Sequence, residues 1–217
     1  PTASMGTDIP LAALSDCHPL LFHYFKQQFA QVTNPPIDSL REEIVTDTSV
    51  YLGSQGNLLE EKDSCCSVLE VHNPILDGRD MDKIRSLKHP QFHVEEISLL
   101  FYQGLSLEEA VEMLFVSCDQ AIRKGANILI LSDRGMDEEH LAIPSLLAVS
   151  ALEQHFVRTK KKTAVSIVLE SGEPRDVHQF AALIGYGVGA VYPYLAHECI
   201  CEMIEEDILD KETSAAI

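Results

Sequence analysis

The stretch that decides the fold is residues 128–196, ILILSDRGMDEEHLAIPSLLAVSALEQHFVRTKKKTAVSIVLESGEPRDVHQFAALIGYGVGAVYPYLA. Two apolar runs rich in β-forming residues, 128–131 and 165–169, each lead into a polar turn, and an amphipathic helical pattern follows each turn. This alternation is typical of βα units, whose strands pair in a parallel sheet. The stretch therefore predicts an α/β fold.

The alternation continues on both sides of this stretch. Ser106 and Glu109 have the spacing of a capping box, and an apolar stripe follows them as far as Gly125, so we predict a long helix there. Another helix is expected after Pro144, which suits a first helical turn. Further strands are predicted at residues 67–71, 94–101 and 189–192, and further helices at 80–87, 174–185 and 196–206.

Four or five such units are too few for the eight of a closed (β/α) barrel. We therefore predict an incomplete, barrel-like parallel sheet with helices, over residues 61–217, preceded by an irregular helical segment, residues 1–60. In that segment the apolar spacing predicts a helix over residues 20–32, stopped by Pro35 and Pro36. Asp38 is expected to cap a short helix that ends at Ile44. We expect the segment to wrap another domain or the body that follows.

The composition limits the class of partner. The formal net charge of −18 argues against nucleic acid, because phosphate binding needs concentrated Lys and Arg. No apolar run approaches the roughly 18 residues that would span a bilayer. The six cysteines have no metal-ligand spacing, so we expect no metal and free thiols in a reducing cytoplasm. The chain begins at Pro1 without a Met, and we expect it to be part of something longer.

Polar side chains follow the two strands of the deciding stretch, at the edge where parallel sheets usually bind ligands. Asp133 and Arg134 would serve as a general base and an anion clamp, or else as a loop-anchoring ion pair or an interface to another domain. Glu170 and Glu173 resemble an acid–base cluster with His178. Glu173, however, also suits the start of a helix, where negative charge is favoured.

The glycines at 185, 187 and 189 do not predict a phosphate-binding loop. A dinucleotide fingerprint follows a strand and opens a helix, whereas here the glycines follow a helix and precede a strand. We interpret them as a tight turn.

The motifs FAQVTNPPID, residues 29–38, and LESGEPRDVHQFAALIGYG, residues 169–187, are long and specific. With MGTDIPLAALS at residues 5–15 and LGSQGNLL at residues 52–59, they closely resemble the central domain of the large subunit of glutamate synthase, over roughly residues 5–200. That enzyme family makes glutamate from glutamine and 2-oxoglutarate.

The resemblance implies a connecting role without cofactor in this chain. In the family an amidotransferase domain releases ammonia, and a later domain binds FMN and a 3Fe-4S cluster. The central domain joins them and helps enclose the ammonia passage. A small subunit or ferredoxin supplies electrons to the whole enzyme. We expect Thr33, Asn34, Pro35 and Pro36 to approach the passage, and we expect the chain alone to be inert. The alternative is a stand-alone (β/α)-type enzyme, which would gather Asp133, Glu170 and Glu173 in one pocket and raise their pKa values.

Overall fold

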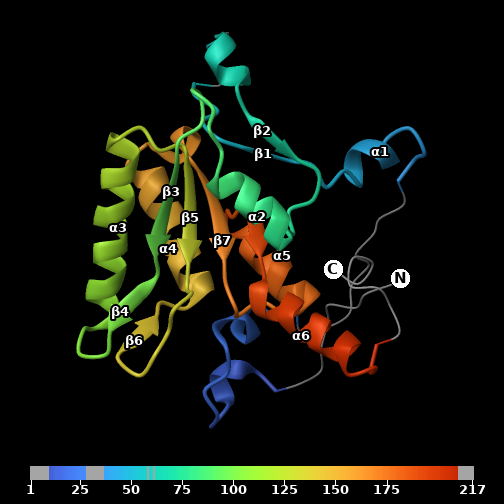
Figure 1. The fold of residues 1–217 in the computed structure, drawn as a ribbon, viewed down its shortest axis with the longest axis vertical. Helices are drawn as coiled ribbons and strands as arrows, with labels where there is room; N and C mark the ends of the chain where they lie inside the picture. Colours follow the sequence, from blue (N-terminus) through green and yellow to red (C-terminus); the bar gives the residue numbers. More distant parts are fainter. Residues whose placement is uncertain (1–9, 28–36, 58, 61, 210–217) are drawn as a thin grey trace.

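A parallel sheet forms the centre of the molecule (Figure 1). The computed structural model describes residues 10–27, 37–57, 59–60 and 62–209. The sheet has four strands, which lie side by side in chain order. They are β3 (Val94–Ser98), β5 (Ile128–Ser132), β7 (Ser166–Glu170) and β8 (Ala190–Tyr192).

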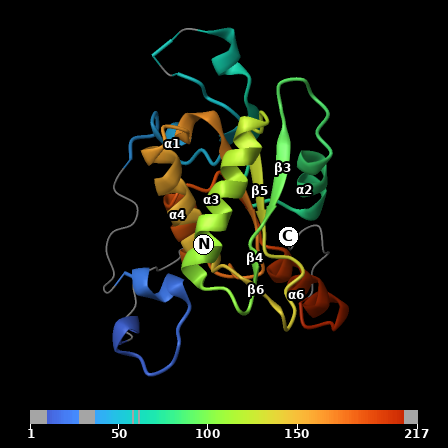
Figure 2. The ribbon, with the colours of Figure 1, turned by 90° about the vertical axis from the view of Figure 1, so that its left-hand side faces the viewer.

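Three helices cover one face of the sheet, and one helix covers the other. Figure 2 shows the sheet between α3 and α4 on one side and α2 on the other. Alongside α2 lies a two-stranded antiparallel hairpin, β1 and β2. The bounds are α3 (Leu107–Arg123), α4 (Ser145–Arg158), α5 (Val177–Gly185), α2 (Gly78–Arg85), β1 (Val50–Leu52) and β2 (Leu69–Val71).

This arrangement confirms the predicted α/β class with an incomplete, barrel-like sheet. Strands that add one after another, with their connecting helices on one face, are the pattern of a (β/α) barrel. The four strands do not close, and α2 with the hairpin covers the face that would be a barrel interior. The sheet is therefore open, with β3 and β8 as its edge strands.

Alternate residues of each strand enter two separate cores. Leu129, Leu131 and Ile167 pack toward α3, α4 and α5, and Ile130 and Val168 pack toward α2. The region before residue 60 contributes to both, because Phe22 is buried in the first core and Leu52 in the second. The division of the chain at residue 60 stays a prediction.

The local signals at the ends of α3 and α5 act as the sequence predicts. Ser106 and Glu109 form the capping box at the start of α3. After α5, Gly187 has a φ of 111°, which side chains rarely adopt. A Cβ on Gly189 would lie 2.6 Å from Cδ2 of Leu52 and 3.3 Å from the carbonyl oxygen of Ile167, so a side chain at this position would crowd its neighbours. The predicted tight turn is confirmed.

Two strand predictions need correction, and two short strands were missed. The strand expected at 67–71 is β2, and it pairs with β1 instead of joining the parallel sheet. The strand expected at 94–101 divides at Leu99, whose backbone amide donates to the carbonyl of Ser132. Beyond it, β4 (Leu100–Tyr102) leaves the sheet and pairs with β6 (His140–Ala142), which the sequence analysis missed together with β1.

Helix boundaries also differ at several places. The helix expected over 20–32 is a 3-10 turn, η2 (Leu21–Phe25), and Lys26 is already extended; residues 28–36 lie outside the described part. Asp38 does accept from the amides of Leu40 and Arg41, just before α1 (Glu42–Val45). Helix α5 starts after Asp176, which caps it, and not at Pro174. The remaining elements are α6 (Tyr194–Glu205), η1 (Ala12–Leu14), η3 (Asp63–Cys66) and η4 (Lys162–Ala164).

Candidate functional site

Glu170 is the most enclosed charged group at the carboxyl end of the sheet. It is the last residue of β7, and its side chain is fully buried on the face covered by α2. Oε2 accepts a 2.7 Å hydrogen bond from the Ser132 hydroxyl and another from Arg85. Oε1 accepts from Nε of Arg134 at 2.7 Å. Both carboxylate oxygens are therefore occupied by groups of the same chain.

These donors decide the charge state of Glu170. Burial by itself raises the pKa of the Glu170 carboxyl, but the hydrogen bonds from Ser132 and Arg134 and the charge of Arg85 outweigh burial. The pKa lies below its ordinary value, so the group remains an anion at neutral pH. The raised pKa that the stand-alone enzyme reading predicts for Glu170 is therefore wrong.

The two arginines extend the cluster to other elements. Nε of Arg85 donates to Glu96 on β3 at 2.9 Å, and a terminal nitrogen of Arg134 lies 3.7 Å from Glu198 on α6. The Arg134 guanidinium also stacks over the ring of Tyr194, with 3.8 Å from Cζ to the ring centroid. Through these contacts, a network of ion pairs connects α2, β3, β7 and α6.

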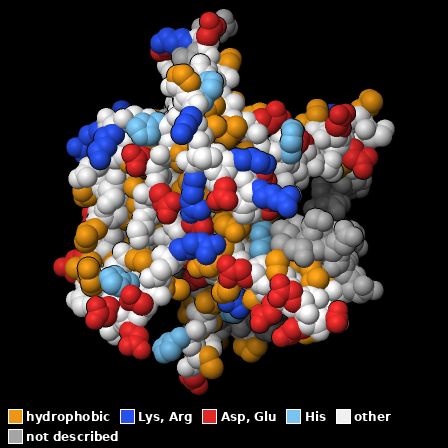
Figure 3. Space-filling view, in the orientation of Figure 1, with side chains coloured by type: hydrophobic (Ala, Val, Ile, Leu, Met, Phe, Trp, Pro, Cys, Tyr) orange, Lys and Arg blue, Asp and Glu red, His pale blue; other side chains and the backbone are white. Residues whose placement is uncertain are grey.

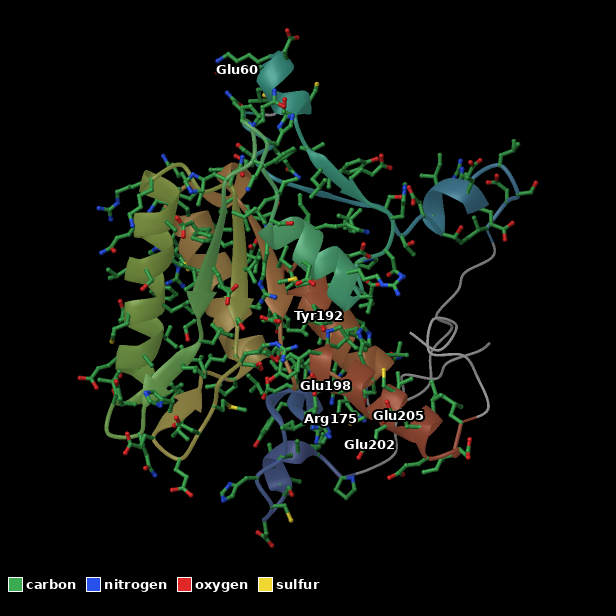
Figure 4. The ribbon with its side chains drawn as sticks, viewed as in Figure 1. Glu60, Arg175, Tyr192, Glu198, Glu202 and Glu205 are labelled. Atoms are coloured by element: carbon green, nitrogen blue, oxygen red, sulfur yellow. The ribbon has the colours of Figure 1, made fainter. Side chains whose placement is uncertain are left out.

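The surface around this cluster has a corresponding division of charge. In Figure 3, basic side chains gather over α2 and acidic side chains over α6. The residues are Arg79, Lys83 and Arg85 on α2 and Glu198, Glu202 and Glu205 on α6. Figure 4 shows these three glutamates along α6, with Glu198 nearest to Tyr192.

Asp133 is held separately, beyond the end of β5. Its side chain is buried, with Oδ2 accepting from the Ser171 hydroxyl at 2.6 Å and from the Gly172 amide at 3.1 Å. Burial raises the pKa of the Tyr194 hydroxyl to about 12, and the nearby negative charge of Asp133 adds to this effect. Asp133 and Arg134 therefore do not pair with each other, although they are neighbours in the chain. Both lie in the loop after β5, and each anchors that loop to a different partner.

Glu173 accepts hydrogen bonds from the first residue of helix α4. Its Oε2 accepts from the backbone amide of Ser145 at 2.7 Å and also from the Ser145 hydroxyl. Ser145 is the first residue of α4, where backbone amides lack helical partners and negative charge is favourable. The helix-start interpretation of Glu173 holds, with the difference that the helix is α4 and not the following α5.

Asp133 and Glu173 line one hollow of about 400 Å³ at this edge of the sheet. Glu170 is absent from the described residues that line it. The predicted cluster of three carboxylates is therefore brought together only in part, since Glu170 lies on the α2 face. The described lining consists of Leu20, Asp133, Met136, Ala142, Ile143, Pro144, Gly172, Glu173, Arg175, Gln179, Tyr194 and Leu195.

Several residues of this region were missed by the sequence analysis. Arg85, Ser145 and Tyr194 lie in helices without a motif that distinguishes them, and only the fold brings them to the strand ends. Thr33, Asn34, Pro35 and Pro36 fall outside the described residues. Among the described residues, no group of three His, Cys, Asp or Glu side chains is placed to hold a metal ion. None of the described helices is long and apolar enough to cross a membrane.

The carboxylates at the strand ends have hydrogen-bond partners within the chain. Each predicted carboxylate accepts hydrogen bonds from its own chain, and each such bond fixes a loop at the end of a strand. Glu170, which is fully buried among its donors, is held as an anion and resists movement. These groups are therefore suited to holding loops in place.

Known proteins with similar sequences agree with the predicted resemblance. A family model described as the glutamate synthase central domain matches residues 1–216. The Bacillus subtilis glutamate synthase (NADPH) large chain is 45% identical over 217 residues, which is 100% of this chain and 14% of that protein. The Saccharomyces cerevisiae glutamate synthase (NADH) is 40% identical over 95% of this chain and 10% of its own length.

A ferredoxin-dependent relative is similar to the same degree. Ferredoxin-dependent glutamate synthase 2 of Synechocystis sp. is 40% identical over 92% of this chain and 13% of its own length. The chain thus spans between 10 and 14% of the length of these relatives. The match of the family model to nearly every residue and the identities over almost the whole chain show that this chain belongs to the glutamate synthase central domain family.

Proposed function

We propose that this chain is the connecting domain of a glutamate synthase, placed between the amidotransferase domain and the FMN-binding domain of one polypeptide. In this role it helps enclose the passage through which ammonia travels to 2-oxoglutarate. The family membership and the small share of each relative that the chain spans support this proposal. The glutamate-forming, reductive activity belongs to the whole enzyme, and the chain alone is inert.

The observation that carries the proposal is the saturation of the strand-end carboxylates. A general acid or base must be free to exchange a proton with substrate. Glu170 instead accepts from Ser132, Arg85 and Arg134, and its pKa is lowered. The wall of an ammonia passage must keep its shape and exclude water. Loops that are fixed by such hydrogen bonds suit this task.

The same domain serves different reductants. Relatives named for NADPH, NADH and ferredoxin resemble the chain at 45%, 40% and 40% identity. We therefore propose that FMN, the 3Fe-4S cluster and the contact with a small subunit or ferredoxin belong to other parts of the enzyme. In this proposal, the central domain is a rigid support that the other parts of the enzyme contact.

A direct test measures the chain alone against the full-length enzyme. The purified chain is scanned for flavin absorbance and assayed for ammonia release from glutamine, with the full-length enzyme as the positive control. We expect no flavin spectrum and no ammonia from the chain. Bound flavin or turnover would overturn the connecting role and favour the stand-alone enzyme.

The passage itself is tested at Thr33 and Asn34. The nearest described part before them is docked on the body, because Phe22 is buried and its carbonyl accepts from Nε2 of His178 at 2.9 Å. In the full-length enzyme, Thr33→Val and Asn34→Leu should increase the ammonia lost per glutamate formed. Thr159→Ala, at the far end of α4, is the control. Unchanged stoichiometry in both variants would remove these residues from the passage.

A further inference from the structure

Residues 74–76 pair with the outer side of β8 through a single parallel bridge. The amide of Val191 donates to the carbonyl of Pro74 at 2.7 Å, and the amide of Leu76 donates to the carbonyl of Val191 at 2.8 Å. From this bridge the chain passes through α2 onto one face of the sheet, whereas α3, α4 and α5 cover the other face. In open α/β sheets, ligands bind beyond the carboxyl ends of the strands where the chain changes face in this way.

A groove opens beyond this bridge, between α2 and α6, with a volume of about 1090 Å³. We call it the α2–α6 groove. Negative charge dominates its described lining, which contains Arg79 and the five carboxylates of Asp77, Asp82, Glu198, Glu202 and Glu205. Figure 4 shows the three glutamates one after another along α6.

Most of this negative charge is not neutralised by the chain itself. Glu198 lies 3.7 Å from Arg134. Three of the other carboxylates have no cationic partner within the described part of the chain: Asp82, Glu202 and Glu205. No three His, Cys, Asp or Glu side chains among the described residues are arranged to hold a metal ion. The charges are spread along the groove, which suits several basic side chains better than one cation.

Helix α6 is also left without cover. It is 12 residues long, yet none of its residues is buried. By contrast, α2, α3, α4 and α5 each bury at least two of theirs. A helix of this length is marginal by itself in water and depends on packing for its stability. The described residues supply little of that packing, so α6 presents an unpartnered face.

His197 adds a second unsatisfied group to the groove. It lies in the first turn of α6, and its Nδ1 is buried without a hydrogen-bond partner among the described residues. Burial lowers the pKa of the His197 imidazole, and the charge of Asp77 opposes this only in part, so the ring is uncharged at neutral pH. Buried polar atoms in folded proteins nearly always have a partner. The groove therefore lacks a polar contact as well as positive charge.

We propose that the α2–α6 groove is the docking surface for a basic segment of another domain of the same polypeptide. Lys and Arg side chains of that segment pair with Asp82, Glu202 and Glu205, and the segment covers α6. Complementary charge favours this partner over an anionic or a purely apolar one. This chain spans 14% of the Bacillus subtilis relative, so such a protein has ample sequence to supply the segment. The inference rests on the connecting role proposed above and assigns one contact surface to it.

The test is hydrogen exchange of the α6 amides in the full-length enzyme, read by mass spectrometry. We expect these amides to exchange at least about 100-fold more slowly than in an unstructured peptide, because the docked segment keeps the helix closed. Glu202→Lys combined with Glu205→Lys should lower this protection by at least about 10-fold, since the reversed charges repel a basic segment. Lysines near the C-terminal end of a helix favour the helix itself, so they would not loosen α6 directly.

A matched variant and an internal reference accompany this measurement. Glu138→Lys combined with Glu139→Lys makes the same change of charge on an exposed loop outside the groove, and it should leave the protection of α6 unchanged. The amides of α3, which packs on the sheet, report whether each variant is folded.

Four results would each overturn the proposal. They are an unprotected α6 in the unmodified enzyme, protection that resists the charge reversal, an equal loss in the matched variant, and protection that falls on dilution of the enzyme. The last result would assign α6 to a contact between two copies. Failure here is distinct from failure of the connecting role, because that role falls only if the chain alone binds flavin or releases ammonia.

Discussion

Nε of Arg134 donates a 2.7 Å hydrogen bond to Oε1 of Glu170, and this bond ties the loop after β5 to the last residue of β7. The two partners differ in their contact with water. The Glu170 side chain is 0% exposed, whereas that of Arg134 is 43% exposed. Removal of the buried partner should therefore cost more than removal of any exposed charge nearby.

Glu170→Gln is expected to lower the free energy of unfolding by about 2–3 kcal/mol, because it leaves two arginines without their shared anion. This is below the roughly 3–5 kcal/mol of a fully buried pair, since both arginines keep contact with solvent. Urea denaturation measures the difference. Glu198→Gln is the control: this carboxylate is exposed and 3.7 Å from Arg134, and it should change stability by less than about 1 kcal/mol. Equal effects of the two variants would contradict the role given to Glu170.

The lowered pKa of Glu170 has a definite consequence for pH dependence. The ordinary pKa of a glutamate carboxyl, as in the unfolded chain, is 4.5, and the pKa of Glu170 in the folded chain is lower. The stabilisation is therefore complete above the unfolded value and is lost as the pH falls through the folded pKa. Urea denaturation from pH 7 down to about pH 3 should show a steeper acid loss of stability in the unmodified chain than in Glu170→Gln. Parallel curves would mean that Glu170 titrates in the folded state as it does in the unfolded chain.

The sequence predicted the parallel sheet because its strands are continuous apolar runs. Residues 128–131 are apolar throughout, as a strand buried on both faces requires. β6 was missed because it has only three residues, His140–Ala142, and its pairing with β4 is a long-range event. The early end of η2 at Phe25 has the same cause, since docking of Phe22 overrides the helical spacing of its neighbours.

The candidate site was predictable in position but not in chemistry. The placement of Glu170 at a strand end follows from the βα pattern. Its partner Arg85 is 85 residues away in the chain, on the one helix that covers the opposite face of the sheet. No local pattern distinguishes that arginine from other basic residues of a helix end. The charge state of Glu170 depends on this contact, so it required the folded structure.

Glu173→Ala should weaken the start of α4. Loss of the carboxylate leaves the amide and hydroxyl of Ser145 without their acceptor, at a cost of about 0.5–2 kcal/mol. Native-state hydrogen exchange should show faster exchange of the Ser145 amide, with little change at the C-terminal end of α4. Glu138→Ala, in an exposed loop, is the control. Unaltered protection of Ser145 would show that water replaces Glu173 without loss.

The cysteines should fall into distinct reactivity classes. Burial raises the pKa of the Cys118 thiol to about 12, and the charge of Asp119 adds to it, so almost no thiolate forms at neutral pH. Cys17, Cys66 and Cys199 are exposed. With a thiol reagent under native conditions, these three should react first, and Cys118 only after unfolding. Rapid native labelling of Cys118 would mean that α3 opens readily from the sheet.

Phe22 provides the test of whether the N-terminal segment belongs to the folded body. Its ring is 1% exposed in the core beneath α4 and α5, and its carbonyl accepts from Nε2 of His178 at 2.9 Å. Phe22→Ala should lower the free energy of unfolding by about 3–5 kcal/mol, the cost of emptying a buried aromatic site. Phe25→Ala is the matched control, because Phe25 is 46% exposed and its ring meets that of Tyr186 edge to face, at 5.5 Å between ring centroids. It should cost less than about 1.5 kcal/mol. Urea denaturation of both variants measures the two losses of unfolding free energy. A large loss for Phe22→Ala alone places the N-terminal segment in the same cooperative unit as the sheet. Similar small losses for both variants would mean that the segment packs on the sheet only weakly.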